Sequence, residues 1–284
     1  MAGTLFVVAT PIGNMDDISA RAVSVLQSVD LIAAEDTRHS GRLMSHFQIT
    51  TPLVAYHDHG SEAQGERIFA ALDAGQDVAL ISDAGTPLVS DPGYRLVRSA
   101  REKAYKVTPL PGACAMITAL CAAGLPSDRF CFEGFLPAKQ SQRRKALELL
   151  ASETRTLIFY EAPHRIIATV EDLIDVFGAE REATLARELT KTYETLLNGN
   201  LSELLIKIKG DVNQQKGEMV LVVRGFDGAE QSAQEQEEER VLKLLLVDLP
   251  VKQAAGLAAK ICDAQRNALY KKALILKETL TSES

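Results

Sequence analysis

The sequence predicts an α/β protein with two lobes, followed by a linker and a small basic module of helices. Up to residue 124, short apolar runs alternate with amphipathic helical patterns. In the next hundred residues some strand-like runs follow one another directly, and a polar, acidic stretch then precedes three more helical patterns. We therefore predict a parallel-sheet lobe, an α+β lobe, a linker and a helix-turn-helix-like module, at residues 1–124, 125–225, 226–239 and 240–284.

Each strand-like run of the first lobe is followed by a helical pattern, which is typical of βαβ units on a parallel sheet. The strands are expected at residues 5–9, 31–34, 53–56, 78–81 and 106–110. The helices are expected at residues 18–29, 39–47, 62–72, 94–103 and 113–123.

In the second lobe, strands and helices do not alternate regularly. The runs at 183–187 and 194–197 have no helix between them and predict antiparallel pairing. The other expected strands and helices of this lobe are 130–132, 156–160 and 219–224, and 143–151, 163–177 and 201–208. The stretch at 225–239 has too few apolar residues to pack and is expected to be a linker. Three compact helices are expected beyond it, at 241–247, 252–261 and 267–276.

Several classes of protein are disfavoured by simple patterns. No run approaches ~18 apolar residues, and the amino terminus enters a strand-like run without a basic segment, so we expect a cytoplasmic protein without membrane spans. The four cysteines form no CxxC pair and are expected to be reduced and structural. His57 and His59 could ligate a metal, but no third ligand is placed beside them, so we expect no metal.

Two turns rich in glycine and proline carry the strongest functional signal. They are SDAGTPLVSDPG at 82–93 and PLPGACA at 109–115, and each follows a strand-like run. Such turns leave backbone N–H and C=O groups unpaired at the carboxyl edge of a sheet, where open α/β sheets bind ligands. They predict a backbone-lined pocket for a small polar cofactor.

The first turn, TPIGN at 10–14, matches neither GxGxxG nor GxxxxGK[ST]. A Rossmann NAD enzyme and a P-loop NTPase are therefore both disfavoured. A simple tight turn remains the alternative to a binding role for this segment.

Charged residues gather at further strand ends. In the corner at 35–39, EDTRH, helix capping explains the acids but not Arg38 and His39, because positive charge is unfavourable at a helix amino terminus. We therefore favour a binding role for Arg38. Residues 159–165 and 186–192 also place both signs of charge at strand ends. Surface ion pairs, each worth about 0–1 kcal/mol, are the alternative reading there.

On these segments the chain resembles the RsmI family of ribosomal RNA small-subunit 2′-O-ribose methyltransferases, within the wider tetrapyrrole-methylase-like superfamily. Members that act on tetrapyrroles carry a GxGPGD first turn, whereas Gly13 and Asn14 stand here without that aspartate. The matching segments are TPIGN (10–14), DLIAAEDTRH (30–39), SDAGTPLVSDPG (82–93), LPGACA (110–115), GLPSDRF (124–130), FYEAPHR (159–165), ARELTKTYE (186–194) and KGEMVLVV (216–223).

The resemblance implies a two-lobed tetrapyrrole-methylase-like fold, S-adenosylmethionine as cofactor between the lobes, and a homodimer. It also implies 2′-O-methylation of a cytidine in the decoding region of small-subunit ribosomal RNA. We expect this RNA to be bound within the assembled subunit, with free RNA as the alternative. The residues that the resemblance assigns to the cofactor are Ile12, Gly85, Thr86, Val89, Cys114, Ala115, Tyr160, Glu161 and Leu189.

A ribose hydroxyl is a poor nucleophile, so methyl transfer needs in-line alignment and benefits from a base. Our hypothesis is that Asp36 or Glu188 accepts the proton. Arg38, Arg187 and Lys191 would then bind RNA phosphate or stabilise the developing oxyanion. Alignment alone is the alternative, because the sulfonium is already an activated donor.

The net charge of −7 argues against a protein coated all over by nucleic acid, but the charge is unevenly spread. Residues 250–277 contain six basic residues and one acid, and residues 139–145 contain four basic residues and no acid. Phosphate contacts supply sequence-independent affinity for RNA, although a solvated helix face is the alternative. The expected RNA contacts are Lys139, Arg143, Arg144, Lys252, Arg266, Lys271 and Lys272.

Three rival functions remain at this stage. A porphyrinoid or other small-molecule methyltransferase of the same superfamily is disfavoured by Asn14 and by the basic tail. A protein methyltransferase resembling diphthine synthase would share the cofactor cleft. A non-enzymatic RNA-binding protein predicts degenerate cofactor turns, whereas both turns are intact here.

Overall fold

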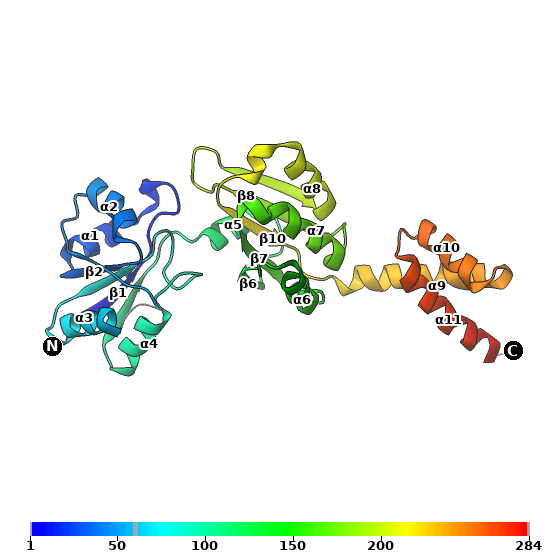
Figure 1. Ribbon diagram of the computed structural model, residues 1–284, viewed down its shortest axis with the longest axis horizontal. Helices are drawn as coiled ribbons and strands as arrows, with labels where there is room; N and C mark the ends of the chain where they lie inside the picture. Colours follow the sequence, from blue (N-terminus) through cyan, green and yellow to red (C-terminus); the bar gives the residue numbers. More distant parts are fainter. Residues whose placement is uncertain (1, 59–61, 283–284) are drawn as a thin grey trace. The chain divides into compact units, whose positions relative to one another are not determined.

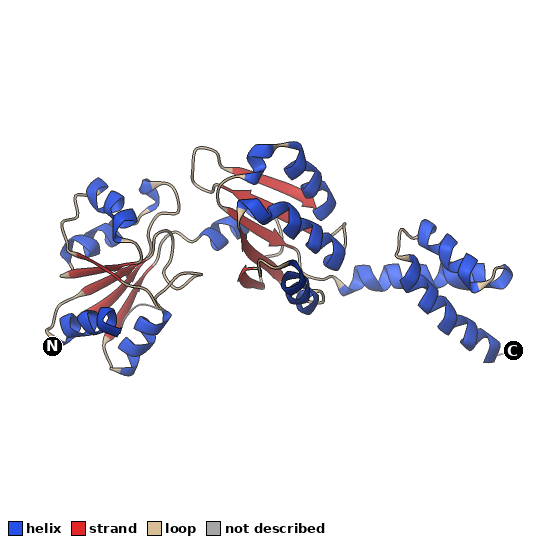
Figure 2. Cartoon of the chain, in the orientation of Figure 1, coloured by secondary structure: helices blue, strands red, loops and turns tan. Residues whose placement is uncertain are grey.

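The structure is a computed structural model that describes residues 2–58 and 62–282 (Figure 1). It divides into two compact units, Met1–Gly225 and Phe226–Ser284, and each is described by itself. The first unit contains two five-stranded sheets with helices on their faces, which confirms the predicted α/β class (Figure 2). No helix in the described part of the chain is long and apolar enough to cross a membrane.

All strands of the first sheet are parallel, in the order β3-β2-β4-β1-β5. The strands are β1 (Thr4–Val8), β2 (Leu31–Ala34), β3 (Leu53–Ala55), β4 (Val78–Ile81) and β5 (Lys106–Leu110). The helices of this lobe are α1 (Ala20–Ser28), α2 (Thr37–His46), α3 (Glu62–Asp73) and α4 (Tyr94–Glu102), with a 3-10 turn, η1, at Met15–Asp17.

The first sheet has a separate hydrophobic core on each face, because side chains along its buried strands point alternately to the two faces. In β2, for example, Ala33 contributes to the core with α3 and α4, whereas Ile32 contributes to the core with α1 and α2. Successive side chains of a strand point to opposite faces, so a strand covered on both sides reads as a continuous apolar run. Figure 1 shows the two helix pairs on the two faces.

The second sheet is mixed, in the order β6-β7-β10-β8-β9. The pair β6–β7 is parallel and the other three pairs are antiparallel, as the successive strands at 183–187 and 194–197 predicted. Its strands are β6 (Phe130–Phe135), β7 (Thr156–Glu161), β8 (Glu182–Arg187), β9 (Thr195–Asn200) and β10 (Met219–Val223). The helices are α5 (Ala115–Ala123), α6 (Gln140–Leu150), α7 (Ile166–Phe177) and α8 (Leu201–Gly210), with 3-10 turns η2 (Pro163–Arg165) and η3 (Val212–Gln215). Helix α5 lies in the segment expected to close the first lobe, but it packs against this second sheet.

The two faces of the second sheet are covered differently. Leu157, Phe159 and Leu221 pack in a large core with α6, α7 and α8. On the opposite face, Ile158 and Val220 pack with α5 and with Ile12 from the first lobe. This second face therefore belongs partly to the contact between the lobes, and it carries the site described below.

The second unit contains α9 (Gly228–Asp248), α10 (Val251–Ile261) and α11 (Arg266–Ser282). Leu242, Ala255, Ala258, Leu269 and Ala273 form its small core. Most of the segment expected as a linker, residues 226–239, is helical and forms the first half of α9. Alanine, glutamine and glutamate are good helix formers, so a polar segment without a core of its own can still be helical.

Candidate active site

The turns that follow β1, β4 and β5 meet at the carboxyl edge of the first sheet. Thr10 N donates to Gly85 O at 2.8 Å, and Gly85 N donates to Thr10 O at 3.0 Å. The hydroxyl of Thr86 donates to Ala113 O at 2.9 Å. Three segments far apart in the sequence are therefore joined into one backbone scaffold, as the glycine- and proline-rich turns predicted.

The turn at 82–93 has an unusual backbone. Gly85 has φ 81°, and two residues with side chains, Leu88 and Ser90, have φ 74° and 63°. A left-handed conformation is uncommon for residues other than glycine, and it costs about 1–3 kcal/mol where the surrounding structure imposes it. Such strain is concentrated at binding sites, and here it shapes the wall of a cavity.

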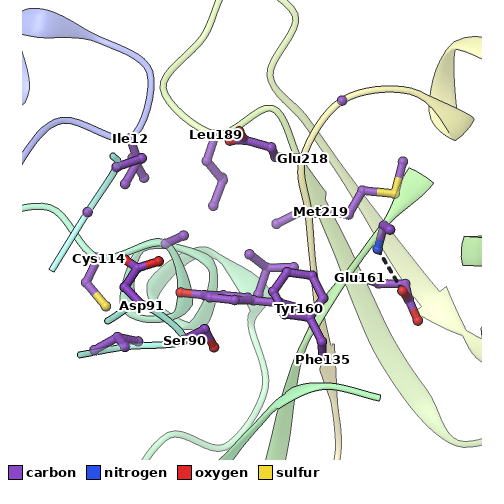
Figure 3. A pocket seen from close by; sticks show the side chains of 18 of the residues that line it. Ile12, Ser90, Asp91, Cys114, Phe135, Tyr160, Glu161, Leu189, Glu218 and Met219 are labelled. Atoms are coloured by element: carbon purple, nitrogen blue, oxygen red, sulfur yellow. Dashed lines mark hydrogen bonds between the residues drawn. The ribbon is translucent and has the colours of Figure 1, made fainter. Parts of the chain in front are cut away.

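This first cavity has a volume of about 360 Å³ and lies between the joined turns and the second sheet. The nine residues that the resemblance assigns to the cofactor all line it. Figure 3 shows Ile12 and Leu189 opposite Tyr160, so both lobes contribute to its walls. Further lining residues outside that set include Asp91, Phe135, Ala186, Met219 and Val220.

Tyr160 and Glu161 contribute to this cavity in different ways. The Tyr160 hydroxyl accepts a hydrogen bond from Met116 N at 3.2 Å, and its ring contacts that of Phe135 edge-on. Burial, followed by the charge of nearby Cys114, raises the pKa of Tyr160 to about 12. The Glu161 carboxylate instead points away from the cavity, where Ala162 N donates to it at 2.7 Å (Figure 3). Tyr160 thus offers a neutral side chain to a ligand.

Asp91 is a carboxylate on the wall of the first cavity (Figure 3). Burial is the main reason that its pKa is raised to about 6, and the negative charges of Glu35 and Asp83 add to the effect. Desolvation also raises the pKa of Glu35. The raised pKa shows that Asp91 lacks a nearby positive charge. A cationic ligand in the cavity would supply that counter-charge.

Asp36 and Arg38, two of the predicted catalytic residues, form an exposed pair at the start of α2. Asp36 is the N-cap and accepts from Arg38 N at 2.8 Å, and the two side chains form an ion pair at 3.1 Å. The hydrogen bonds from Arg38 hold the pKa of Asp36 down at about 2. A carboxylate with so low a pKa is a weak proton acceptor at neutral pH. Neither residue lines the first cavity.

Glu188 and Lys191, the other two predicted catalytic residues, form a network with Glu218 at the edge of the cavity. The ammonium of Lys191 lies 2.9 Å from both carboxylates, and Glu218 N donates to Glu188 at 2.8 Å. Burial raises the pKa of Glu188, but the hydrogen bonds from Glu218 N and Lys191 outweigh it and leave the pKa lowered. Glu188 is therefore committed to holding Lys191 in place.

A second, smaller cavity of about 220 Å³ adjoins the first. Ile12, Ala84 and Glu218 line both cavities, so the two share a wall. Lys191 lines the second cavity, as do His39 and Arg42 from α2. The spacing of residues along α2 gives no signal for Arg42, because its place at a cavity depends on turns that are remote in the sequence.

The basic run at 139–145 is not uniformly available to RNA. Lys139 is exposed, and Arg144 is half-buried in an ion pair with Asp175 at 2.8 Å. Arg143 is only 3% exposed, and it forms an ion pair with buried Asp172 at 2.7 Å. We therefore no longer expect Arg143 to contact RNA, because its guanidinium belongs to the packing between α6 and α7.

The predicted RNA residues of the second unit are more accessible. Lys252, Arg266 and Lys271 are exposed. Lys272 is half-buried and forms an ion pair with Glu238. Glu238 lies on α9, in the segment expected as a linker, so this pair ties α11 to α9.

His59, one of the two histidines considered for a metal, lies outside the described residues. Within the described residues, no group of three potential metal ligands occurs.

Two family matches cover most of the chain. The tetrapyrrole (corrin/porphyrin) methylases match residues 4–205, and the RsmI C-terminal HTH domain matches residues 232–277. Ribosomal RNA small subunit methyltransferase I of Pseudomonas aeruginosa is 58% identical over 96% of this chain and 97% of that protein. The protein of the same name from Escherichia coli O157:H7 is 56% identical over 96% of this chain and 95% of that protein.

Solved structures with low sequence identity share the fold of the first unit. A diphthine synthase has a TM-score of 0.59 at 18% identity and covers 78% of this chain and 90% of that chain. A uroporphyrin-III C-methyltransferase from Thermus thermophilus, solved in complex with S-adenosyl homocysteine, has a TM-score of 0.54 at 15% identity. It covers 78% of this chain and 97% of that chain.

Proposed function

The chain belongs to the RsmI family of methyltransferases, within the tetrapyrrole methylases, and we propose that it uses S-adenosylmethionine to methylate a ribose 2′-oxygen of small-subunit ribosomal RNA. The proposed acceptor is a cytidine of the decoding region within the assembled subunit. As a protein that acts on ribosomal RNA, it would work in the cytoplasm, as a homodimer.

The observation that carries this proposal is the first cavity. Nine residues assigned to the cofactor come from five separate segments of the sequence and line one space of about 360 Å³. A pocket of this size, with an apolar wall and few polar groups, is typical of small-molecule and cofactor sites. Asp91 supplies negative charge for a sulfonium, and Tyr160 supplies an aromatic ring against which a cation is favourable.

In the proposed reaction, the cavity would hold the donor so that its methyl group faces the acceptor oxygen in line with the S–CH₃ bond. Lys191, held by Glu188 and Glu218, would bind a phosphate or stabilise the developing alkoxide. Arg38 is 91% exposed and would contact the RNA backbone from outside the cavity. The low pKa of Asp36 and the pairing of Glu188 make both weak candidates for the base.

The exposed basic residues of the second unit support RNA as the partner. Lys252, Arg266 and Lys271 can contact phosphates without loss of an ion pair in the described structure. Such contacts supply affinity without sequence information. Selection of one nucleotide would then come from the shape of the assembled subunit.

The decisive experiment measures transfer of radiolabelled methyl from S-adenosylmethionine to small subunits from cells that lack this protein. Free ribosomal RNA and a porphyrinoid serve as parallel acceptors, and nuclease mapping locates the label. We expect label on one ribose 2′-oxygen of the assembled subunit. Turnover of the porphyrinoid, with no label on RNA, would support small-molecule methylation instead.

A further inference from the structure

Two side chains that line the second cavity have hydrogen-bonding groups that the described fold does not use. Arg42 is exposed at its rim and forms no hydrogen bond or ion pair with the described residues. Ser40, one turn from the N-terminus of the same helix, is 3% exposed, yet its hydroxyl has no partner there. A buried hydroxyl without a hydrogen bond costs free energy, and an unpaired guanidinium beside a cavity is available to an anion.

The second cavity lies directly beside the first. It shares Ile12, Ala84 and Glu218 with the first cavity, and both Ile12 and Glu218 are labelled in Figure 3. A donor in the first cavity would therefore lie next to the second. Transfer requires the reacting atoms to approach to about 3–3.5 Å, so the acceptor must enter from an adjoining space.

Asp83 is the carboxylate of this cavity that has no cationic partner among the described residues. Its Oδ1 accepts a hydrogen bond from Asp36 N at 3.0 Å, which orients the carboxylate. Glu218, the other carboxylate of the lining, is paired with Lys191. Asp83 thus combines a defined orientation with free acceptor capacity, and its neighbour Ala84 is part of the shared wall.

We propose that the second cavity is the acceptor subsite, in which Arg42 and His39 bind a phosphate of the target nucleotide and Asp83 accepts the proton of its 2′-hydroxyl. This inference rests on the proposed function. The hydroxyl oxygen forms a bond to the methyl carbon while the C–S bond breaks, and that electron pair stays on sulfur. The hydroxyl proton passes to the carboxylate of Asp83, which leaves neutral S-adenosylhomocysteine and a 2′-O-methyl nucleotide.

Two substitutions test the two halves of this assignment. In D83N the amide oxygen can still accept from Asp36 N, so the fold of the corner is retained while the proton acceptor is lost. We expect kcat for methylation of small subunits to fall about 100-fold, with the Kd for S-adenosylmethionine unchanged. In R42Q we expect KM for subunits to rise about tenfold, with a smaller change in kcat.

The control is R101Q, which removes an exposed arginine of α4 that lines neither cavity. It should have the parent's kinetics. Unchanged kcat in D83N would overturn the role of Asp83, and so would loss of S-adenosylmethionine binding in this variant, because the residue would then belong to the donor site. Unchanged KM in R42Q would overturn the phosphate contact. Failure of the unsubstituted protein to methylate subunits would instead refute the proposed function.

Discussion

The aliphatic stem of Lys191, from the second lobe, occupies the space that a side chain on Gly13 of the first lobe would need. Gly13 belongs to the turn after β1, and Lys191 follows β8. The absence of a side chain at one residue therefore allows a charged side chain of the other lobe to reach the wall between the two cavities. This close approach explains glycine at position 13 without any requirement for a positive φ.

Substitution G13A should displace Lys191 from Glu188 and Glu218. A misplacement of about 1 Å in a catalytic constellation can cost about 100-fold in rate, and we expect a loss of that order in methyl transfer. Crowding at a packed contact should also lower the free energy of unfolding by about 1–3 kcal/mol. The control is G65A in α3, where an added methyl meets no atom within 4 Å. G65A should keep full activity. Full activity in G13A would contradict a role for Lys191 in methyl transfer.

Binding of S-adenosylmethionine should weaken at acidic pH. The pKa of Asp91 is about 6, so protonation below that value removes the negative charge offered to the sulfonium. We expect Kd to rise by up to about tenfold per pH unit below pH 6, and calorimetric titration from pH 5 to 8 would measure it. D91N should lack this dependence. The Kd for S-adenosylhomocysteine, which carries no sulfonium charge, should depend less on pH. An equal pH dependence of Kd for both ligands would contradict the role of Asp91 as counter-charge.

The same aspartate should limit stability at neutral pH. Its pKa in the folded protein is raised above the usual value of 3.8, so its contribution to folding is retained below about pH 4 and lost as the pH rises through 6. D91N should therefore increase the free energy of unfolding at pH 7.5, by about 1 kcal/mol after allowance for solvent screening. Urea unfolding at pH 7.5 and pH 4 measures the effect. A variant that is less stable at pH 7.5 would refute it.

The buried pair of Arg143 and Asp172 should matter for stability and not for RNA. Their side chains are 4% and 1% exposed, so D172N leaves a buried guanidinium without its counter-charge. We expect a loss of about 3–5 kcal/mol in urea unfolding. D175N breaks the exposed pair with Arg144 and should cost no more than about 1 kcal/mol. Similar losses in the two variants would show that burial of the first pair has no energetic consequence.

Three exposed basic residues of the second unit should set the salt dependence of RNA binding. The triple variant K252Q/R266Q/K271Q removes up to three phosphate contacts, so the slope of log K against log salt should become shallower by about 2–3. Filter binding to small subunits at several salt concentrations measures the slope. The matched control R21Q/R101Q/K106Q removes three exposed bases from the first lobe. An equal change in both variants would indicate a general effect of net charge.

Much of the fold could be predicted because it depends on local patterns. The run at 78–81 is buried on both faces, and it forms the central strand β4 of the parallel sheet, as its composition indicates. Helix boundaries depend on capping contacts: the helix expected at 39–47 begins at Thr37, because the side chain of Asp36 accepts from Arg38 N and caps it. Residues 228–239, expected as a linker because of their low apolar content, are helical, since glutamine and glutamate are good helix formers.

The sequence by itself determined which segments are turns and which turns carry functional residues, because glycine and proline restrict the backbone locally. Only the tertiary structure decided which of these residues face a common space. Arg143 and Arg144 are neighbours in one basic run, yet they point in different directions from α6. Arg143 is buried beside Asp172, whereas Arg144 is half-buried and pairs with Asp175. Arg42 and Asp83 line one cavity because β1, β2 and β4 are neighbours in a parallel sheet. Side-chain direction and strand order are products of long-range packing, and a local pattern does not contain them.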